Sequence, residues 1–251
     1  MKVIILGSGG FYPDVTGEAV RNPAGYAVDA GAGVLVFDLG FGNVRQLARA
    51  GIELSRISHV FLSHFHPDHW GDLPALLFAY RYNAKPLNGR LTIAGPAGLS
   101  ALVARIRAVS PGYFDVSGYA EEVIELEPGR EFVAGACRVG CMKVEHGAQS
   151  LAYKIRGPHE GETVCYTGDA MFSAELRNFC ARAELVIADA GCAGCPPGSP
   201  HMTPAEAVSL SDTACVCLSH LCGRSAEQAE ELAGGRIFAA RDLQVIDLPL
   251  L

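Results

Sequence analysis

The segment His64-Phe65-His66-Pro67-Asp68-His69 restricts what this chain can fold into more than any other part of the sequence. It directly follows residues 60–63, an apolar run of the kind that forms a buried strand. Imidazole and carboxylate groups are ligands that zinc prefers in proteins. We expect the strand to be a rigid support that presents these groups in one loop, which Pro67 stiffens because it has no N–H. A chance match to this spacing is rare, so the segment predicts a metal site.

One loop cannot surround two metal ions, so further ligands must come from later parts of the chain. Three residues stand where a predicted strand ends: His146 after residues 138–145, Asp169 after 163–166 and His220 after 214–218. A lone histidine in such a place is more often structural than a ligand. Together with the 64–69 segment, however, the three complete a consistent set of nitrogen and oxygen ligands.

Short apolar runs bounded by Gly, Pro or Asp predict strands in two groups, each covered by helices. The predicted strands are residues 3–6, 26–29, 34–38, 60–63, 91–94, 123–126, 138–145, 151–155, 163–166, 185–188, 214–218 and 243–248. The predicted helices are residues 43–50, 72–80, 96–109, 173–182, 204–212 and 226–233. Two such halves, packed sheet against sheet, predict an α/β protein with four layers in the order αββα. No linker separates the halves, so residues 1–251 are expected to form a single domain.

The composition restricts the partners of the chain. Hydrophobic residues make up 49% of the 251 and charged residues 19%, enough for a large buried core. The net charge of −7 and the lack of a Lys/Arg cluster argue against binding of a long nucleic acid. No apolar run is long enough for a membrane span, and the apolar start before Gly7 is too short for a signal peptide. We therefore expect a cytoplasmic protein without a membrane partner.

The chain has nine cysteines, an odd number, and shows no export signal, so we expect the cysteines to be reduced thiols. Cys192-Ala193-Gly194-Cys195 has the spacing of one zinc half-site, but no other pair matches a finger pattern. Incidental thiols are the expectation for this group.

Several short motifs beyond the histidine segment resemble the metallo-β-lactamase superfamily, and within it the ribonuclease Z-like branch. They are Gly7-Ser8-Gly9-Gly10, Arg21-Asn22, Asp38-Leu39-Gly40-Phe41-Gly42, Leu54-Ser55-Arg56-Ile57, Glu145-His146, Thr167-Gly168-Asp169, His201-Met202-Thr203 and Leu218-Ser219-His220. The resemblance covers almost the whole chain. It implies the four-layer αββα metallo-β-lactamase sandwich.

The resemblance also implies roles for the candidate ligands. His64, His66 and His146 would hold the first zinc ion; Asp68, His69 and His220 the second; and Asp169 would bridge both. Two Zn²⁺ ions are expected, although Mn²⁺ or another divalent ion could replace them. Asp38 either orders the segment His64–His69, here called the metal loop, or simply forms a turn before glycine. The sequence leaves both possibilities open.

A histidine in the position of His201 assists departure of the leaving oxygen in ribonuclease Z-like enzymes, and a carboxylate orients it. Here Ala188-Asp189-Ala190-Gly191 stands where that family usually shows His-Glu-Ala-Thr, so the acid is kept but shortened and the histidine is lost. His201 is expected to be catalytic with Asp189 as its orienting acid; the alternative is a surface or capping histidine. Asp68 could also accept the proton of the nucleophile.

The function that follows is a zinc-dependent hydrolase, foremost a phosphodiesterase that attacks a small diester with a metal-bridging hydroxide. The alternatives are a lactonase or thioesterase, a ribonuclease Z-like transfer-RNA 3′ endonuclease, and a non-catalytic metal-binding scaffold. Only 22 residues separate His146 from Asp169, too few for the arm with which ribonuclease Z grips transfer RNA. Relatives are often dimers, which leaves a homodimer open. Aromatic residues of the segments 78–90 and 110–120 either line the substrate pocket or pack in the core; they are Phe78, Tyr80, Tyr82, Tyr113, Phe114 and Tyr119.

Overall fold

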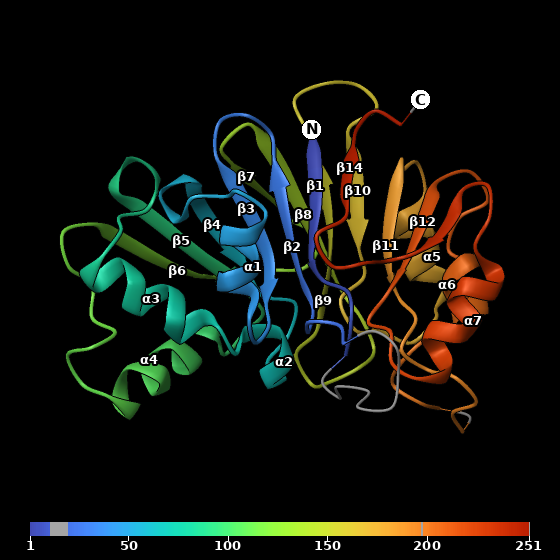
Figure 1. Cartoon of the computed structure of the whole chain (residues 1–251), viewed down its shortest axis with the longest axis horizontal. Helices are drawn as coiled ribbons and strands as arrows, with labels where there is room; N and C mark the ends of the chain where they lie inside the picture. Colours follow the sequence, from blue (N-terminus) through green and yellow to red (C-terminus); the bar gives the residue numbers. More distant parts are fainter. Residues whose placement is uncertain (11–19, 197, 251) are drawn as a thin grey trace.

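The computed structural model describes residues 1–10, 20–196 and 198–250. Two seven-stranded sheets lie at its centre, with helices α1, α3 and α4 on the outer side of the first sheet and α5, α6 and α7 on the outer side of the second (Figure 1). This arrangement confirms the predicted four-layer αββα sandwich.

The first sheet has the strand order β14-β1-β2-β3-β4-β5-β6. Neighbours from β14 to β3 are antiparallel, and those from β3 to β6 are parallel. Its strands are β1 (Lys2–Gly7), β2 (Gly25–Asp29), β3 (Val34–Leu39), β4 (Ile57–Phe61), β5 (Arg90–Gly95), β6 (Ala120–Glu125) and β14 (Val245–Asp247). The helices of this half are α1 (Asn43–Arg49), α2 (Pro67–Trp70), α3 (Leu73–Tyr82) and α4 (Leu99–Val109), with short 3₁₀ turns at Leu54–Arg56 and Leu87–Gly89.

The second sheet has the order β13-β12-β11-β10-β9-β8-β7. Neighbours from β7 to β10 are antiparallel, and those from β10 to β13 are parallel. Its strands are β7 (Glu131–Ala134), β8 (Cys137–Lys143), β9 (Leu151–Arg156), β10 (Thr163–Tyr166), β11 (Leu185–Asp189), β12 (Cys215–Ser219) and β13 (Ile237–Ala239). The helices of this half are α5 (Ala174–Cys180), α6 (Pro204–Val208) and α7 (Arg224–Leu232).

Three apolar clusters separate the four layers, and β3 shows why the central strands are mostly apolar. Every residue of β3 is buried. Leu35 and Phe37 point into the cluster between the sheets, whereas Val34 and Val36 point into the cluster beneath α1, α3 and α4. A strand covered on both faces needs apolar residues at odd and even positions alike, which explains the continuous run.

The structure corrects several predicted elements. The last strand, β14, joins the first sheet beside β1 and not the second group. Strands β7 and β13 and the short helix α2 were not predicted, and α6 ends at Val208 rather than at residue 212. β4 ends at Phe61, two residues earlier than predicted. Within the described part of the chain, every helix is too short or too polar to cross a membrane.

Candidate metal centre

The histidine segment lies just beyond β4, where the chain leaves the first sheet. After Leu62, whose N–H donates to the carbonyl of Ala94 at 2.8 Å, the chain turns into α2. His66 is the N-cap of this helix and Pro67 occupies its first turn, so the proline nucleates a helix where the sequence indicated only a stiff turn. Asp68 and His69 therefore project from one helical turn.

The other three candidate ligands follow strands of the second sheet that run in the same direction, β8, β10 and β12. His146 and Asp169 each lie three residues beyond a strand end, and His220 follows β12 directly. His220 adopts a φ of 60°, a left-handed conformation that few residues other than glycine adopt. Since equivalent ends of parallel strands meet at one sheet edge, the three side chains converge there.

All seven predicted ligands meet in two adjoining groups. His64, His66, His146 and Asp169 form one and Asp68, His69 and His220 the other, each with ligand atoms within 4.8 Å of one another. Asp169 lies between them: its Oδ2 is 3.6 Å from Nε2 of His64 and from Nε2 of His146, 3.2 Å from that of His69 and 3.3 Å from that of His220. A single carboxylate oxygen thus faces both groups.

Buried nitrogen atoms without hydrogen-bond partners show that this cluster fits a cation. Among the described residues, Nε2 of His64, of His69 and of His220 are buried and have none. A buried polar atom without a partner costs about 1–3 kcal/mol. Several such atoms around one carboxylate are explained if they coordinate divalent metal ions, and imidazole with carboxylate is a donor set that suits zinc.

The electrostatics prepare these groups as ligands. Burial lowers the pKa of His64, and the neighbouring His69 lowers it further, so this ring is neutral near pH 7. Burial opposes ionisation of Asp169, but the surrounding imidazoles, His220 and His69 first, outweigh it and hold the pKa of this carboxyl well below its usual value. Neutral imidazole and ionised carboxylate are the forms that bind a metal.

The contacts of Asp38 decide whether it orders the metal loop or only forms a turn before glycine. It is fully buried, and its carboxylate accepts hydrogen bonds from the N–H and the hydroxyl of Ser63, both at 2.6 Å, and from the hydroxyl of Tyr166. It also pairs with Nδ1 of His69 at 2.7 Å. This contact places the proton of His69 on Nδ1 and leaves Nε2 free to face the centre. Asp38 therefore orders the metal loop.

His201 lies at the side of the centre, in contact with Asp189. Its Nδ1 is 2.9 Å from Oδ2 of Asp189, and its ring centroid is 4.7 Å from that of His146. The backbone N–H of Ala170 and of Gly191 donate to Asp189 at 3.0 and 2.9 Å, so the shortened acid is rigidly placed and reaches the histidine. Burial opposes protonation of His201, but Asp189 outweighs it and raises the pKa of the imidazole.

One expectation about the cysteines was wrong. Cys192 and Cys195 form a disulfide, so this pair is neither a reduced thiol pair nor a zinc half-site. The spacing alone is compatible with a disulfide, a metal or free thiols, and the compartment argument favoured free thiols. The other seven cysteines, all in the described part of the chain, are free. The disulfide lines a cavity of about 250 Å³ together with His201, Phe172, Thr203 and Glu206.

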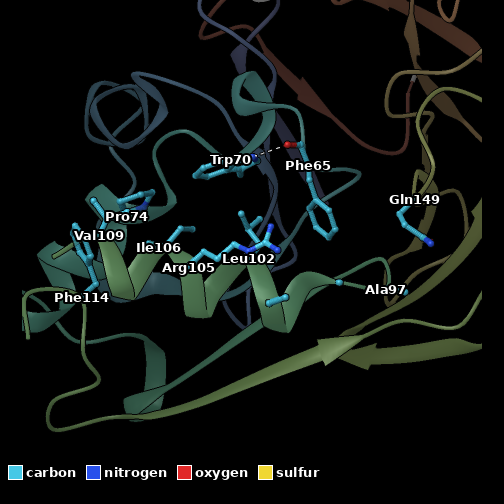
Figure 2. Close-up of a pocket in the computed structure, with 12 residues that line it drawn as sticks. Phe65, Trp70, Pro74, Ala97, Leu102, Arg105, Ile106, Val109, Phe114 and Gln149 are labelled. Atoms are coloured by element: carbon cyan, nitrogen blue, oxygen red, sulfur yellow. Dashed lines mark hydrogen bonds between the residues drawn. The ribbon is translucent and has the colours of Figure 1, made fainter. Parts of the chain in front are cut away.

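A second cavity, of about 780 Å³, lies beside the metal loop, and sequence reasoning did not find most of its wall (Figure 2). Phe65, Trp70 and Leu102 line it, and of the six aromatic residues considered from the sequence only Phe114 does. Tyr80 is buried in the core instead, and Phe78, Tyr82 and Tyr113 are exposed. The sequence does contain an indication that Phe65 lies near the site, because it stands between the candidate ligands His64 and His66.

The sequence and the fold are similar to known proteins. A family model of the beta-lactamase superfamily domain matches residues 27–218. Ribonuclease Z of Methanosarcina mazei is 24% identical over 309 aligned positions, which cover 99% of this chain and 98% of that protein. Ribonuclease Z of Methanosarcina acetivorans is 30% identical over 162 residues, which cover 64% of this chain and only 50% of that protein.

Two solved structures share the fold over nearly their whole length. The metallo-beta-lactamase fold protein YhfI from Bacillus subtilis superposes with a TM-score of 0.80, at 22% identity and 98% coverage of both chains. The short form of human tRNase Z superposes with a TM-score of 0.79, at 22% identity and 100% coverage of both. Because the family model spans well over half of the residues, this chain belongs to the β-lactamase superfamily, in its ribonuclease Z-like branch.

Proposed function

We propose that this protein is a phosphodiesterase that cleaves a small diester with two divalent metal ions, zinc being the ions that the donor set favours. The observation that carries the proposal is the pair of His201 and Asp189, held at 2.9 Å beside a cluster of candidate ligands. A cluster alone would serve any metal-binding protein. An oriented histidine next to it supports chemistry in which a leaving oxygen needs a proton.

In this proposal each of the two groups of candidate ligands would hold one metal ion. His64, His66 and His146 would hold one ion and Asp68, His69 and His220 the other, with Asp169 between them. When bound, such a pair of ions supplies Lewis-acid stabilisation of developing charge and an acidified water molecule. Asp68 would in addition accept the proton of the attacking water.

His201 would act on the leaving group. With Nδ1 facing Asp189, the other ring nitrogen is free to donate a proton to the departing oxygen. The raised pKa of His201 keeps a larger fraction of the ring protonated near neutral pH. An alkoxide is a poor leaving group without a proton, so a phosphodiester gains more from this histidine than an activated ester does.

Transfer-RNA processing is the second candidate, because ribonuclease Z of Methanosarcina mazei aligns with nearly the entire chain. The segment between His146 and Asp169 argues against it. It holds only β9, β10 and a tight turn closed by the N–H of Gly157 donating to the carbonyl of Glu162 at 2.7 Å. The alignment with the Methanosarcina mazei protein has 309 positions against 251 residues here and covers both chains nearly end to end, so it contains internal insertions that this chain lacks.

The test compares two diesters that differ in leaving group, methyl p-nitrophenyl phosphate and methyl phenyl phosphate, on the zinc-loaded protein. His201→Ala should reduce kcat about 100-fold or more for the poorer phenol leaving group and much less for p-nitrophenol. Asp189→Asn should show the same selectivity with a smaller loss. His159→Ala, which changes an exposed histidine in the turn between β9 and β10 that is not a candidate ligand, is the control.

Metal content is measured in parallel. All variants should retain about two ions per chain, because His201 and Asp189 are not proposed as ligands. Equal losses for both diesters would refute the role of His201. Less than one ion per chain in the wild-type protein would favour the scaffold alternative, and cleavage of a transfer-RNA precursor far more efficiently than either diester would favour the second candidate.

A further inference from the structure

The residues of the candidate metal centre differ in their exposure to solvent. His64, Asp68, His69 and Asp169 are buried, whereas His66 is exposed and the side chain of His201 is 25% exposed. His146 lies between these two, with Nε2 3.0 Å from Nδ1 of His66 and its ring 4.7 Å from that of His201. A substrate at this centre would therefore be most accessible to His66 and to His201.

The larger cavity lies on the His66 side. Phe65, which forms part of its wall, immediately precedes His66, and the N–H of the Trp70 indole donates to the carbonyl of Phe65 at 2.9 Å. Figure 2 shows Leu102 and Arg105 extending from α4 toward these two rings, with Gln149 on a separate loop at the other side. The wall is thus tied to the metal loop itself and is aromatic or aliphatic over most of its area.

Two polar groups lie at the margin of this cavity. Gln149 is exposed on the loop that follows His146, and Arg105 is exposed on α4. No acidic side chain in the described part of the chain forms an ion pair with Arg105. An apolar enclosure of about 780 Å³ with a few polar groups has the size and composition of a pocket for a small organic molecule.

The smaller cavity, on the His201 side, differs in size and in chemistry. It measures about 250 Å³, and its wall is mixed: Thr203 and Glu206 line it together with His201, but so do Phe172 and the disulfide. Because His201 is the proposed proton donor to the departing oxygen, the departing alcohol belongs on this side. The group that stays on the phosphorus is then free to extend away from His201, toward Phe65.

We infer that the large apolar cavity is the subsite for the retained group of the diester. The preferred substrate is then a diester with one large aromatic or aliphatic substituent and a smaller leaving alcohol. This inference rests on the proposed phosphodiesterase function and adds the class of substrate. Arg105 would contact an electronegative group at the far end of the retained substituent.

The test uses two diesters with the same leaving group, methyl p-nitrophenyl phosphate and 1-naphthyl p-nitrophenyl phosphate. Release of p-nitrophenol should have a kcat/KM about 100-fold higher for the naphthyl diester, because its ring system leaves water on binding. Ala101→Phe places a ring into the cavity from α4 and should reduce this preference to below about 10-fold. Ala104→Phe is the matched control, since Ala104 is exposed on the same helix and does not line the cavity.

A second measurement does not need turnover. Trp70 is the only tryptophan of the chain and lines the cavity, so its fluorescence reports occupancy. Phenylphosphonate should change the emission saturably and methylphosphonate should not, and Ala101→Phe should abolish the change. If neither diester is cleaved but Trp70 responds to phenylphosphonate, the proposed function is wrong and the aryl subsite stands.

The opposite outcome separates the two proposals. If both diesters are cleaved with equal kcat/KM and Trp70 does not respond, the function stands and the subsite is wrong. A dimer that dissociates in Ala101→Phe with selectivity unchanged would show that a second copy covers this surface, which also overturns the inference.

Discussion

Asp38 is the residue on which the geometry of the metal loop depends. Its carboxylate joins Ser63, His69 and Tyr166 at a backbone position with a φ of 54°, which asparagine also tolerates. Asp38→Asn keeps the shape but removes the charge that holds the proton of His69 on Nδ1. We expect metal affinity, measured by competition with a chelator, to fall about 10- to 100-fold. Asp242→Asn is the control, because Asp242 bonds the N–H of Ser8 and of Asn22 but no candidate ligand; an equal loss there would contradict the prediction.

His59 predicts part of the acid sensitivity of the fold. It is half-buried beside Phe132, and burial lowers its pKa to about 4. A histidine whose pKa is lower in the folded than in the unfolded state stabilises the fold fully above the unfolded value of 6.5, and this contribution is lost as the pH falls from 6.5 toward 4. Each pKa unit is worth about 1.4 kcal/mol, and partial exposure of the ring reduces the effect to about 1–2 kcal/mol.

The measurement is urea denaturation of His59→Gln and of the wild-type protein at pH 7 and pH 4.5. The glutamine variant should lose less stability between the two pH values, because it has no imidazole to protonate. Parallel losses in both proteins would show that burial does not govern the titration of His59.

The individual candidate ligands could be predicted from the sequence, but some of the contacts around them could not. His64, His66 and His69 are close in sequence, so local spacing alone indicates them. The contact between Asp189 and His201 depends on backbone N–H groups of Ala170 and Gly191 that position the carboxylate, and no residue pattern encodes such a distance. The Cys192–Cys195 disulfide was missed because the same spacing serves a metal, a disulfide or free thiols.

The start of α6 connects local helix chemistry to the site. The hydroxyl of Thr203 accepts a hydrogen bond from the N–H of Glu206 at 3.2 Å, and the carboxylate of Glu206 accepts one from the N–H of Thr203 at 2.8 Å. The sequence pattern Thr-Pro-x-Glu indicates such a capping box, and the structure contains it. His201 lies only two residues before this cap, so the cap also fixes the chain that carries His201.

Thr203→Ala should therefore cost about 1 kcal/mol of unfolding free energy and also reduce turnover of diesters with poor leaving groups, by less than about 10-fold. Ser173→Ala removes the corresponding cap of α5, where the hydroxyl accepts from Leu176 at 3.0 Å. It should cost similar stability and leave turnover unchanged. Denaturation and kinetics on both variants check this, and equal turnover in the two would disprove the link between the cap and His201.

Elements with strong local signals were predicted and the others were not, for identifiable reasons. β3 and β11 are buried along their whole length, so their apolar runs are unmistakable. β7 is an edge strand with exposed residues such as Glu131, and β13 has only three residues, so neither has a clear apolar pattern. α2 was missed because its single turn, begun by Pro67, is shorter than any periodicity can show.

The candidate ligands come from both sheets, so bound metal should hold the whole sandwich together. His64 and His69 follow β4 of the first sheet, whereas Asp169 and His220 follow β10 and β12 of the second. Ligand at 100 times its Kd stabilises a folded protein by about 2.7 kcal/mol. For a chain of this size the Tm should rise by about 5 °C with zinc and fall again with a chelator.

Differential scanning calorimetry at several zinc concentrations measures this shift. Asp169→Asn, which removes the carboxylate that faces both groups, should abolish most of the dependence on zinc. Asp212→Asn, which breaks only the surface ion pair with Arg177, should retain it. A Tm that does not change with zinc in the wild-type protein would contradict the proposed bridging of the sheets.

The pairing of β14 with β1 also affects how the molecule is made. Lys2 lies opposite Asp247 and Ile4 opposite Val245, so the ribosome synthesises one strand of this pair more than two hundred residues before its partner. Until then the outer side of β1 offers unpaired N–H and C=O groups to any other extended nascent segment. Pairing so distant in sequence also folds slowly. Chaperones that cover β1 during translation should therefore increase the yield of folded protein.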